Sequence, residues 1–178
     1  EVLGLKYENN PAIIGVIDSA IENSKKAVDY APNTLETHRA RGYILEITQN
    51  YLDAAQEYAA AIEINPYIAD LHLALGRLYY NALGEYNLAV PQLTEADLLN
   101  PADPRPDVYL SRLYQKNGEY ATAIQYAQQA IRDAPTNTYY YGNLGVLYYL
   151  NYDNEKAVDN LTLVVRGGSN DDGVVVEP

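Results

Sequence analysis

The sequence predicts an all-α fold, an α-solenoid of antiparallel helix pairs with extended N- and C-terminal tails. Three series of residues recur at a nearly constant spacing. The first series is five alanines spaced 34, 35, 34 and 34 residues apart: Ala20, Ala54, Ala89, Ala123 and Ala157. A second series follows seven residues later: Ala27, Ala61, Ala96 and Ala130, with Val164 in the last slot. A third series falls five residues further on: Pro32, Pro66, Pro101 and Pro135. Self-similarity at this period indicates stacked units, each of which buries its apolar face on its neighbours.

The repeat divides the chain into segments. Proline cannot continue a helix, so each proline of the third series is expected to close the second helix of a unit. This predicts four full units at about 35–68, 69–103, 104–137 and 138–168, together spanning 34–168. Segment 11–33 matches only a second helix, because the residues before it are too few to supply a first one. Segment 1–10 is then an extended tail, and 169–178 is a polar linker ending in a short apolar tail.

The units share a further pattern of a large residue, Leu-Gly and an aromatic residue, followed by Ala and a second large residue. The last unit reads Tyr141-x2-Leu144-Gly145-x2-Tyr148, then Ala157-x3-Leu161. The second reads His72-x2-Leu75-Gly76-x2-Tyr79, then Ala89-x3-Leu93 and Pro101. The first (His38, Gly42, Ala54, Tyr58) and the third (Asp107, Ser111, Ala123, Ala127) follow it less closely. This pattern resembles the tetratricopeptide repeat. The resemblance implies a right-handed superhelix and a non-catalytic scaffold for protein–protein contacts.

Within that pattern, Gly or Ser on the first helix and Ala on the second are expected where two helices cross, because a larger side chain would hold the backbones apart. The second unit has one extra residue before the turn between its helices, which gives the spacing of 35. Phe, Trp, Met and Cys are absent and Tyr occurs 19 times, so tyrosines occupy slots where a buried phenylalanine would be expected.

Composition excludes several classes of function. A formal net charge of −12 argues against nucleic acid and against an anionic membrane surface as partners. No apolar run approaches the roughly 20 residues that a membrane-spanning helix needs, and no leader-like start is seen. The expected partner is therefore a protein.

We expect no catalytic residues, no metal ligands and no cofactor. His38 and His72 occupy the same slot in two units, which favours packing over metal binding. Asp171 and Asp172 lack the alternating ligands of an EF-hand loop and are interpreted as part of a solvated linker. No catalytic triad or phosphate-binding loop is present.

Arginines are concentrated on the predicted first helices, which in the family line a concave groove. The expected groove residues are Arg39, Tyr43, Arg77, Tyr80, Arg112 and Lys116. Such a surface suits carboxylates or acidic peptides, because arginine binds carboxylates in a bidentate fashion. Family members that clamp a terminal carboxylate use Lys and Asn where this chain has Arg39 and Tyr43, so that clamp is not reproduced. The alternative is that the arginines pair with nearby acids such as Glu36, Glu46 and Asp70.

Apolar tails suggest contacts between copies. The residues that would make them are Val2, Leu3, Leu5, Val174, Val175 and Val176. Head-to-tail contacts of this kind join copies into a homo-oligomer. They give a filament when the rotation from one copy to the next does not close into a ring. Alternatively, the tails are frayed or fold back on their own ends. Asn160 begins the one Asn-x-Thr sequon, a possible glycosylation site in a secreted protein.

The function we predict is a structural subunit that assembles head to tail, with a monomeric adaptor that binds an acidic or extended peptide as the alternative. A filament would place the protein outside the cell or on its surface, and an adaptor in the cytoplasm.

Overall fold

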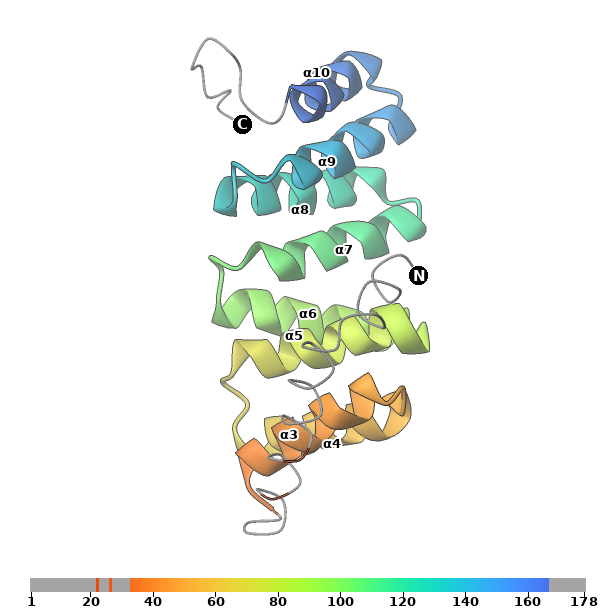
Figure 1. The fold of residues 1–178 in the computed structure, drawn as a ribbon. Helices are drawn as coiled ribbons and strands as arrows, with labels where there is room; N and C mark the ends of the chain where they lie inside the picture. Colours follow the sequence, from red (N-terminus) through yellow and green to blue (C-terminus); the bar gives the residue numbers. More distant parts are fainter. Residues whose placement is uncertain (1–21, 23–25, 27–32, 167–178) are drawn as a thin grey trace. The chain divides into compact units, whose positions relative to one another are not determined.

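The computed structural model describes residues 33–166 together with Glu22 and Lys26 (Figure 1). The side chains of Glu22 and Lys26 form an ion pair of 2.8 Å. The two tails and the rest of the half repeat therefore lie outside the described residues. The chain divides into two compact units, Glu1–Tyr67 and Ile68–Pro178.

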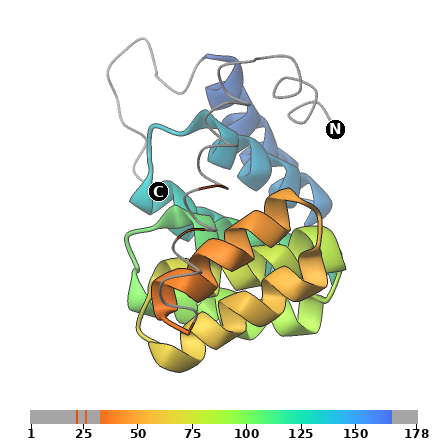
Figure 2. The same cartoon turned by 60° about the horizontal axis from the view of Figure 1, so that its bottom comes forward.

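The first unit contains the helix pair α3 (Leu35–Ile47) and α4 (Tyr51–Ile64), which lie side by side (Figure 2). Thr34 begins α3, because its hydroxyl accepts a hydrogen bond from the backbone N–H of Thr37. At the crossing, a side-chain carbon at Gly42 would stand 2.8 Å from the ring of Tyr58. The absence of a side chain at Gly42 therefore lets the two helices approach.

The described part of the second unit, residues 68–166, contains three helix pairs. They are α5 (Ala69–Leu78) with α6 (Tyr86–Leu99), α7 (Pro104–Lys116) with α8 (Tyr120–Asp133), and α9 (Thr138–Leu150) with α10 (Asn154–Val165). Successive pairs are joined by contacts of α6 with α7 and of α8 with α9. Every regular element of the described residues is helical, which confirms the predicted all-α fold.

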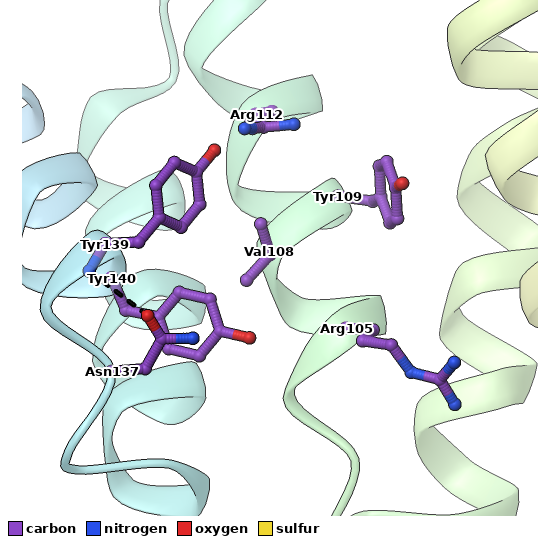
Figure 3. Close-up of a pocket in the computed structure, with 7 residues that line it drawn as sticks. All are labelled: Arg105, Val108, Tyr109, Arg112, Asn137, Tyr139 and Tyr140. Atoms are coloured by element: carbon purple, nitrogen blue, oxygen red, sulfur yellow. Dashed lines mark hydrogen bonds between the residues drawn. The ribbon is translucent and has the colours of Figure 1, made fainter. Parts of the chain in front are cut away.

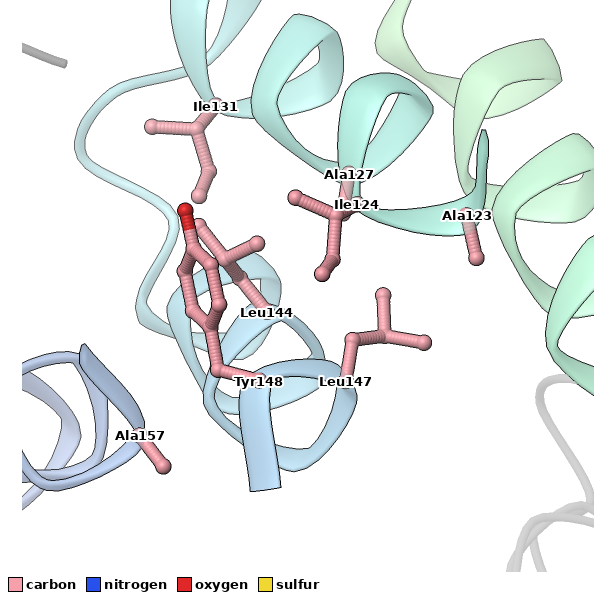
Figure 4. Close-up of a cluster of buried hydrophobic side chains, with 8 residues drawn as sticks. All are labelled: Ala123, Ile124, Ala127, Ile131, Leu144, Leu147, Tyr148 and Ala157. Atoms are coloured by element: carbon pink, nitrogen blue, oxygen red, sulfur yellow. The ribbon is translucent and has the colours of Figure 1, made fainter. Parts of the chain in front are cut away.

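The core of this unit continues from one pair to the next. One buried cluster joins α8, α9 and α10 and comprises Ala123, Ile124, Ala127, Ile131, Leu144, Leu147, Tyr148 and Ala157 (Figure 4). A second joins α5, α6 and α7 through Leu73, Ala89, Leu93, Ala96, Leu110 and Leu113. Each pair buries its apolar side on the next pair, as repeat stacking requires.

Small residues stand at the crossings in this unit too. A side-chain carbon at Gly76 would lie 2.7 Å from Cγ of Leu93, and one at Gly145 would lie 2.8 Å from Cγ of Leu161. The Ser111 hydroxyl instead donates a hydrogen bond of 2.9 Å to the backbone oxygen of Ala123. The contacts at Gly76 and Gly145 confirm the predicted role of glycine at the helix crossings.

The extra residue of the second repeat is accommodated at the end of its first helix. Between α5 and α6 the chain forms a π-helical turn, η1 (Tyr79–Leu83), which ends at Gly84 with φ 68°. A π-turn contains one more residue than the α-helical turn it replaces. The insertion therefore ends before α6 begins, and Leu93 still meets Gly76 as Tyr58 meets Gly42.

Candidate functional site

The first three turns of α7 and the start of α9 form a pocket of about 270 Å³ in the second unit (Figure 3). It is lined by Arg105, Val108, Tyr109, Arg112, Asn137, Tyr139 and Tyr140. Both helices are the first helices of their pairs, the location in which the sequence places the groove. Its volume suits one or two side chains of a polypeptide better than a whole cofactor, because small-molecule sites are usually about 300–1,000 Å³.

Helix caps fix the orientation of the lining residues. Asp103 precedes Pro104 at the start of α7, and its carboxylate accepts the backbone N–H of Arg105 at 3.0 Å. Asn137 begins α9 in the same way, with its side-chain oxygen accepting the N–H of Tyr139 at 3.2 Å. Proline at the first helical position and an Asp or Asn cap are strong start signals. The pocket is thus built on two well-defined helix starts.

Arg105 is held by acidic neighbours. Its guanidinium lies 2.6 Å from Asp103 and 3.0 Å from Asp70, and its side chain points away from Tyr139 and Tyr140 (Figure 3). Burial alone would raise the pKa of Asp103, but the hydrogen bonds from Arg105 outweigh it and hold that pKa below its ordinary value. The guanidinium of Arg105 is therefore already paired with Asp103 and Asp70.

Arg112 is in a different situation. Its guanidinium carbon lies 5.6 Å from the ring centre of Tyr139, a cation–π contact. No carboxylate within residues 33–166 lies within ion-pair distance of Arg112. The side chain is half-buried, so it has lost part of its hydration without gaining an acidic partner. Such a group favours a carboxylate supplied from outside the described residues.

A group of aromatic side chains extends this surface toward η1. Tyr80 lies 5.6 Å from Tyr109 and 5.7 Å from Tyr86, measured between ring centres. The Lys116 ammonium lies 4.9 Å from the ring centre of Tyr86. Tyr109 also lines the pocket, so these contacts make one continuous surface from η1 to α9. We call it the tyrosine–arginine face: Tyr80, Tyr86, Tyr109, Arg112, Lys116 and Tyr139.

The structure therefore brings together three of the six predicted groove residues, Tyr80, Arg112 and Lys116. Arg77 is half-buried in the last turn of α5. Arg39 and Tyr43 are exposed on α3, in the other unit. Sequence reasoning missed Tyr109, Asn137, Tyr139 and Tyr140. The available signal was the run of three tyrosines at 139–141, of which only Tyr141 falls in a repeat slot.

Both histidines are engaged in hydrogen bonds. Nδ1 of His38 lies 2.6 Å from the Glu57 carboxylate, and Nδ1 of His72 lies 2.9 Å from the Gln92 side-chain oxygen. Among the described residues, no group of three or more His, Cys, Asp or Glu side chains is placed to hold a metal ion. Nor does any helix in 33–166 combine the length and apolarity needed to cross a bilayer.

One acidic side chain is buried without a partner. Asp107 on α7 is 1% exposed, and neither carboxylate oxygen has a hydrogen-bond donor among the described residues. Burial, followed by the nearby carboxylates of Asp97 and Asp133, raises the pKa of Asp107 to about 7. Asp107 occupies the slot that holds His or Tyr in the other repeats. Its carboxylate accepts no hydrogen bond there from the described residues.

The residues predicted for self-assembly, Val2, Leu3, Leu5 and Val174–Val176, lie outside the described residues. Helix α10 does expose an apolar stripe, with Val158 63%, Leu161 40% and Val165 88% exposed. Asn160, the sequon residue, lies within α10 and donates its amide to the backbone oxygen of Lys156 at 2.8 Å.

Known proteins share this architecture. The family model described as tetratricopeptide repeat matches residues 15–68 and 110–172, which is more than half of the chain. No curated protein sequence gives a significant match.

Three solved structures illustrate the likeness. MamA from Desulfovibrio magneticus RS-1 is 22% identical with a TM-score of 0.77, and the match covers 86% of each chain. Pseudomonas aeruginosa PilF is 22% identical with a TM-score of 0.77, covering 95% of this chain and 75% of that one. YrrB, described as a TPR protein with an unusual peptide-binding site, is 20% identical with a TM-score of 0.71, covering 87% and 79%. Likeness at these identities concerns the fold alone. On the family match, the chain belongs to the tetratricopeptide repeat family, whose members are typically non-catalytic scaffolds for protein–protein contacts.

Proposed function

We propose that the second unit binds an extended, acidic segment of a partner protein on the tyrosine–arginine face, with a carboxylate at Arg112. The observation that carries this proposal is the half-buried Arg112 guanidinium at a pocket, with no acidic partner in residues 33–166. A buried or half-buried cation without a counter-charge is costly, and a ligand carboxylate would relieve that cost.

The lining residues suit a peptide. Arginine can donate two parallel hydrogen bonds to one carboxylate, which fixes the direction of the ligand as well as its charge. The rings of Tyr109, Tyr139 and Tyr140 offer apolar surface with a hydroxyl at the edge. A pocket of about 270 Å³ accepts the side chain of one ligand residue, while the remaining residues lie along the face.

Electrostatics favours the same class of ligand. The whole chain carries a formal net charge of −12, yet Arg112 and Lys116 are grouped on this one face of the second unit. A local basic surface on an acidic protein steers acidic partners to that surface and repels them elsewhere.

Changing Arg112 to glutamine is expected to weaken peptide binding about 10- to 100-fold, because a hydrogen bond to a charged group is worth about 1.5–3 kcal/mol. The probe is a displayed library of random ten-residue peptides, selected on the full chain. We expect Asp and Glu to be enriched among the selected peptides. Isothermal titration then measures the affinity of each variant for the best peptide.

The matched control is Arg132→Gln, since Arg132 is an exposed arginine on α8 that bonds Gln129 and does not line the pocket. This control should bind like the parent. If the selected peptides carry no acidic residues, or bind the Arg112→Gln variant as tightly as the parent, the proposed site is wrong.

A second candidate function is head-to-tail assembly, which the exposed stripe of α10 favours. Val158, Leu161 and Val165 lie at helical spacings of three and four residues and so share one side of the helix. In a repeat stack, each pair is covered by the first helix of the next pair. A second copy of the chain would supply such a helix, with Val2, Leu3, Leu5 and Val174–Val176 as further contacts.

Under this candidate, the double variant Val158→Asp/Val165→Asp stays monomeric at concentrations where the parent assembles, because two buried carboxylates would oppose the contact. Light scattering with negative-stain electron microscopy over a concentration series measures this. Leu98→Asp serves as the control, since Leu98 is 69% exposed on α6. A parent protein that is monomeric at every concentration removes the candidate.

A further inference from the structure

We infer that residues 167–178 of the chain itself bind the Arg112 pocket in cis, so that the protein carries its own competitor for an acidic partner. The inference rests on the peptide site proposed above and names one of its ligands. Residues 167–178 lie outside the described residues, the last of which is Arg166.

Helix α10 ends close to the residues of α9 that line the pocket. A side-chain carbon at Gly142 on α9 would stand 3.6 Å from Cγ2 of Val164, so the last turn of α10 packs against the first part of α9. Tyr139 and Tyr140 lie on α9 within one turn of Gly142, and both line the pocket. One helical turn is about 5.4 Å along the axis. The described chain therefore ends, after Arg166, within a few residues' reach of the site.

The segment after Arg166 has four residues before its acidic pair. An extended chain covers about 3.3 Å per residue, so Asp171 can stand roughly 17 Å from Arg166 and Asp172 roughly 20 Å. Gly167 and Gly168 come first and permit a sharp change of direction, because glycine adopts both signs of φ. The path for the acidic pair runs from the end of α10 past Gly142 to Tyr139, whose ring contacts Arg112.

The chemistry of the segment matches that of the pocket. It contains three acidic residues, Asp171, Asp172 and Glu177, and no lysine or arginine. Val174–Val176 follow the acidic pair directly. The rings of Tyr109 and Tyr80 continue the surface away from the pocket and offer apolar contact to valine side chains. The order of groups therefore matches: acidic residues and then valines in the segment, and the Arg112 guanidinium and then tyrosine rings on the surface.

Connection to α10 makes the contact effective even when it is individually weak. A short flexible linker holds its ligand at an effective concentration in the millimolar range. A tail that binds its pocket with a dissociation constant near 0.1 mM would then occupy it most of the time and lower the apparent affinity for a partner about tenfold. Only a partner peptide that binds the pocket more tightly than the tail would then displace it.

The first test places a spin label on the tail. The chain contains no cysteine, so the Gly173→Cys variant of the full chain takes a single nitroxide label. We expect selective broadening of the amide NMR signals of Val108, Tyr139 and Tyr140, unchanged on dilution. Tyr149 is the internal control, because it lies near the opposite end of α9 and its signal should persist.

Charge variants test whether the contact is the inferred one. Asp171→Asn/Asp172→Asn, in the labelled chain, should abolish the broadening, and so should Arg112→Glu. Combining Arg112→Glu with Asp171→Lys/Asp172→Lys should restore it, since the exchanged charges attract again. Restoration also shows that the single Arg112→Glu variant was not simply misfolded.

Three outcomes would overturn the inference. The first is broadening of Val108, Tyr139 and Tyr140 no greater than that of Tyr149. The second is broadening only in a mixture of labelled and isotope-enriched copies, which would assign the tail to a second molecule. The third is broadening that survives neutralisation of the two aspartates.

The peptide function is judged separately. If neutralising the tail tightens binding of the selected acidic peptide about tenfold, both the peptide site and its own competitor are supported. If no peptide binds even then, while the labelled tail still reports on the pocket, the peptide function fails and the cis contact stands.

Discussion

Replacing Asp107 by asparagine is expected to raise the free energy of unfolding at pH 8 by an amount on the order of 4 kcal/mol. Asp107 is 1% exposed and its oxygens have no donor within the described part of the chain. Its pKa is raised from 3.8 to about 7, first by burial and then by the carboxylates of Asp97 and Asp133. Each unit of pKa difference between the folded and unfolded chains is worth about 1.4 kcal/mol.

The sign of this effect follows from proton binding. The folded protein keeps the Asp107 proton up to about pH 7, whereas the unfolded chain releases it near 3.8. Between these values the folded state binds more protons, so the free energy of unfolding falls as pH rises and levels off above about 7. Other charges face the same carboxyl: Asp103 raises its pKa and Arg132 lowers it.

Urea unfolding at pH 5.5 and pH 8 measures the change, both values lying above the isoelectric point of about 4.4. At pH 5.5 the gain in unfolding free energy from Asp107→Asn should be about half of that at pH 8. The reason is that pH 5.5 lies about midway between the pKa of Asp107 in the unfolded chain, 3.8, and its pKa in the folded chain, about 7. Asp159→Asn, an exposed acid on α10, is the control and should change little. Equal gains for Asp107→Asn at the two pH values would show that Asp107 does not carry a strongly raised pKa.

Replacing Gly76 by alanine is expected to lower the free energy of unfolding by about 1–3 kcal/mol, the usual cost of overpacking. The new carbon would meet Cγ of Leu93 at 2.7 Å and the backbone nitrogen of Leu93 at 3.2 Å. The side chain can rotate, but the backbone contact requires α5 and α6 to move apart. This outweighs the gain of up to about 1 kcal/mol that alanine brings to a helix.

Gly142→Ala provides the matched control. Gly142 lies inside α9, and its nearest neighbour would be Cγ2 of Val164 at 3.6 Å, an ordinary contact. Here only the helix preference operates, so the same substitution should stabilise by about 0.5–1 kcal/mol. Chemical denaturation of the two variants side by side compares them. If both changes shifted stability in the same direction, close approach at Gly76 would not be what limits that crossing.

The helices and their crossings were predictable from the sequence because they depend on residues that recur. Ala89 and Gly76 are equivalent to Ala54 and Gly42. Because the same residue types recur at these positions, the sequence alone identifies them as helix-crossing positions. The candidate site depends partly on residues that do not recur. Arg77 is equivalent to Arg112 and Asp103 to Asn137, but Tyr139 on α9 stands where α7 has Arg105. A pattern found by comparing repeats passes over such positions.

The burial of Asp107 could not be predicted for a different reason. The slot is defined by packing, and the sequence indicated only that this repeat departs from the pattern there. Whether an acid in that slot reaches solvent depends on the neighbouring side chains of α6 and α8, which are set by tertiary contacts. The same holds for Arg105 and Arg112, since only the structure distinguishes the paired guanidinium from the unpaired one.

The π-turn at Tyr79–Leu83 has a consequence for how this chain can change in length. The added residue does not change the register of the helices after it, because it is accommodated in the π-turn between α5 and α6. The contact between Gly76 and Leu93 is kept. Length changes in this repeat are therefore tolerated at the end of the first helix and not in α6, where one more residue would turn Leu93 away from Gly76. Recombining repeats of this kind is best done by matching their crossings, whatever the number of residues between them.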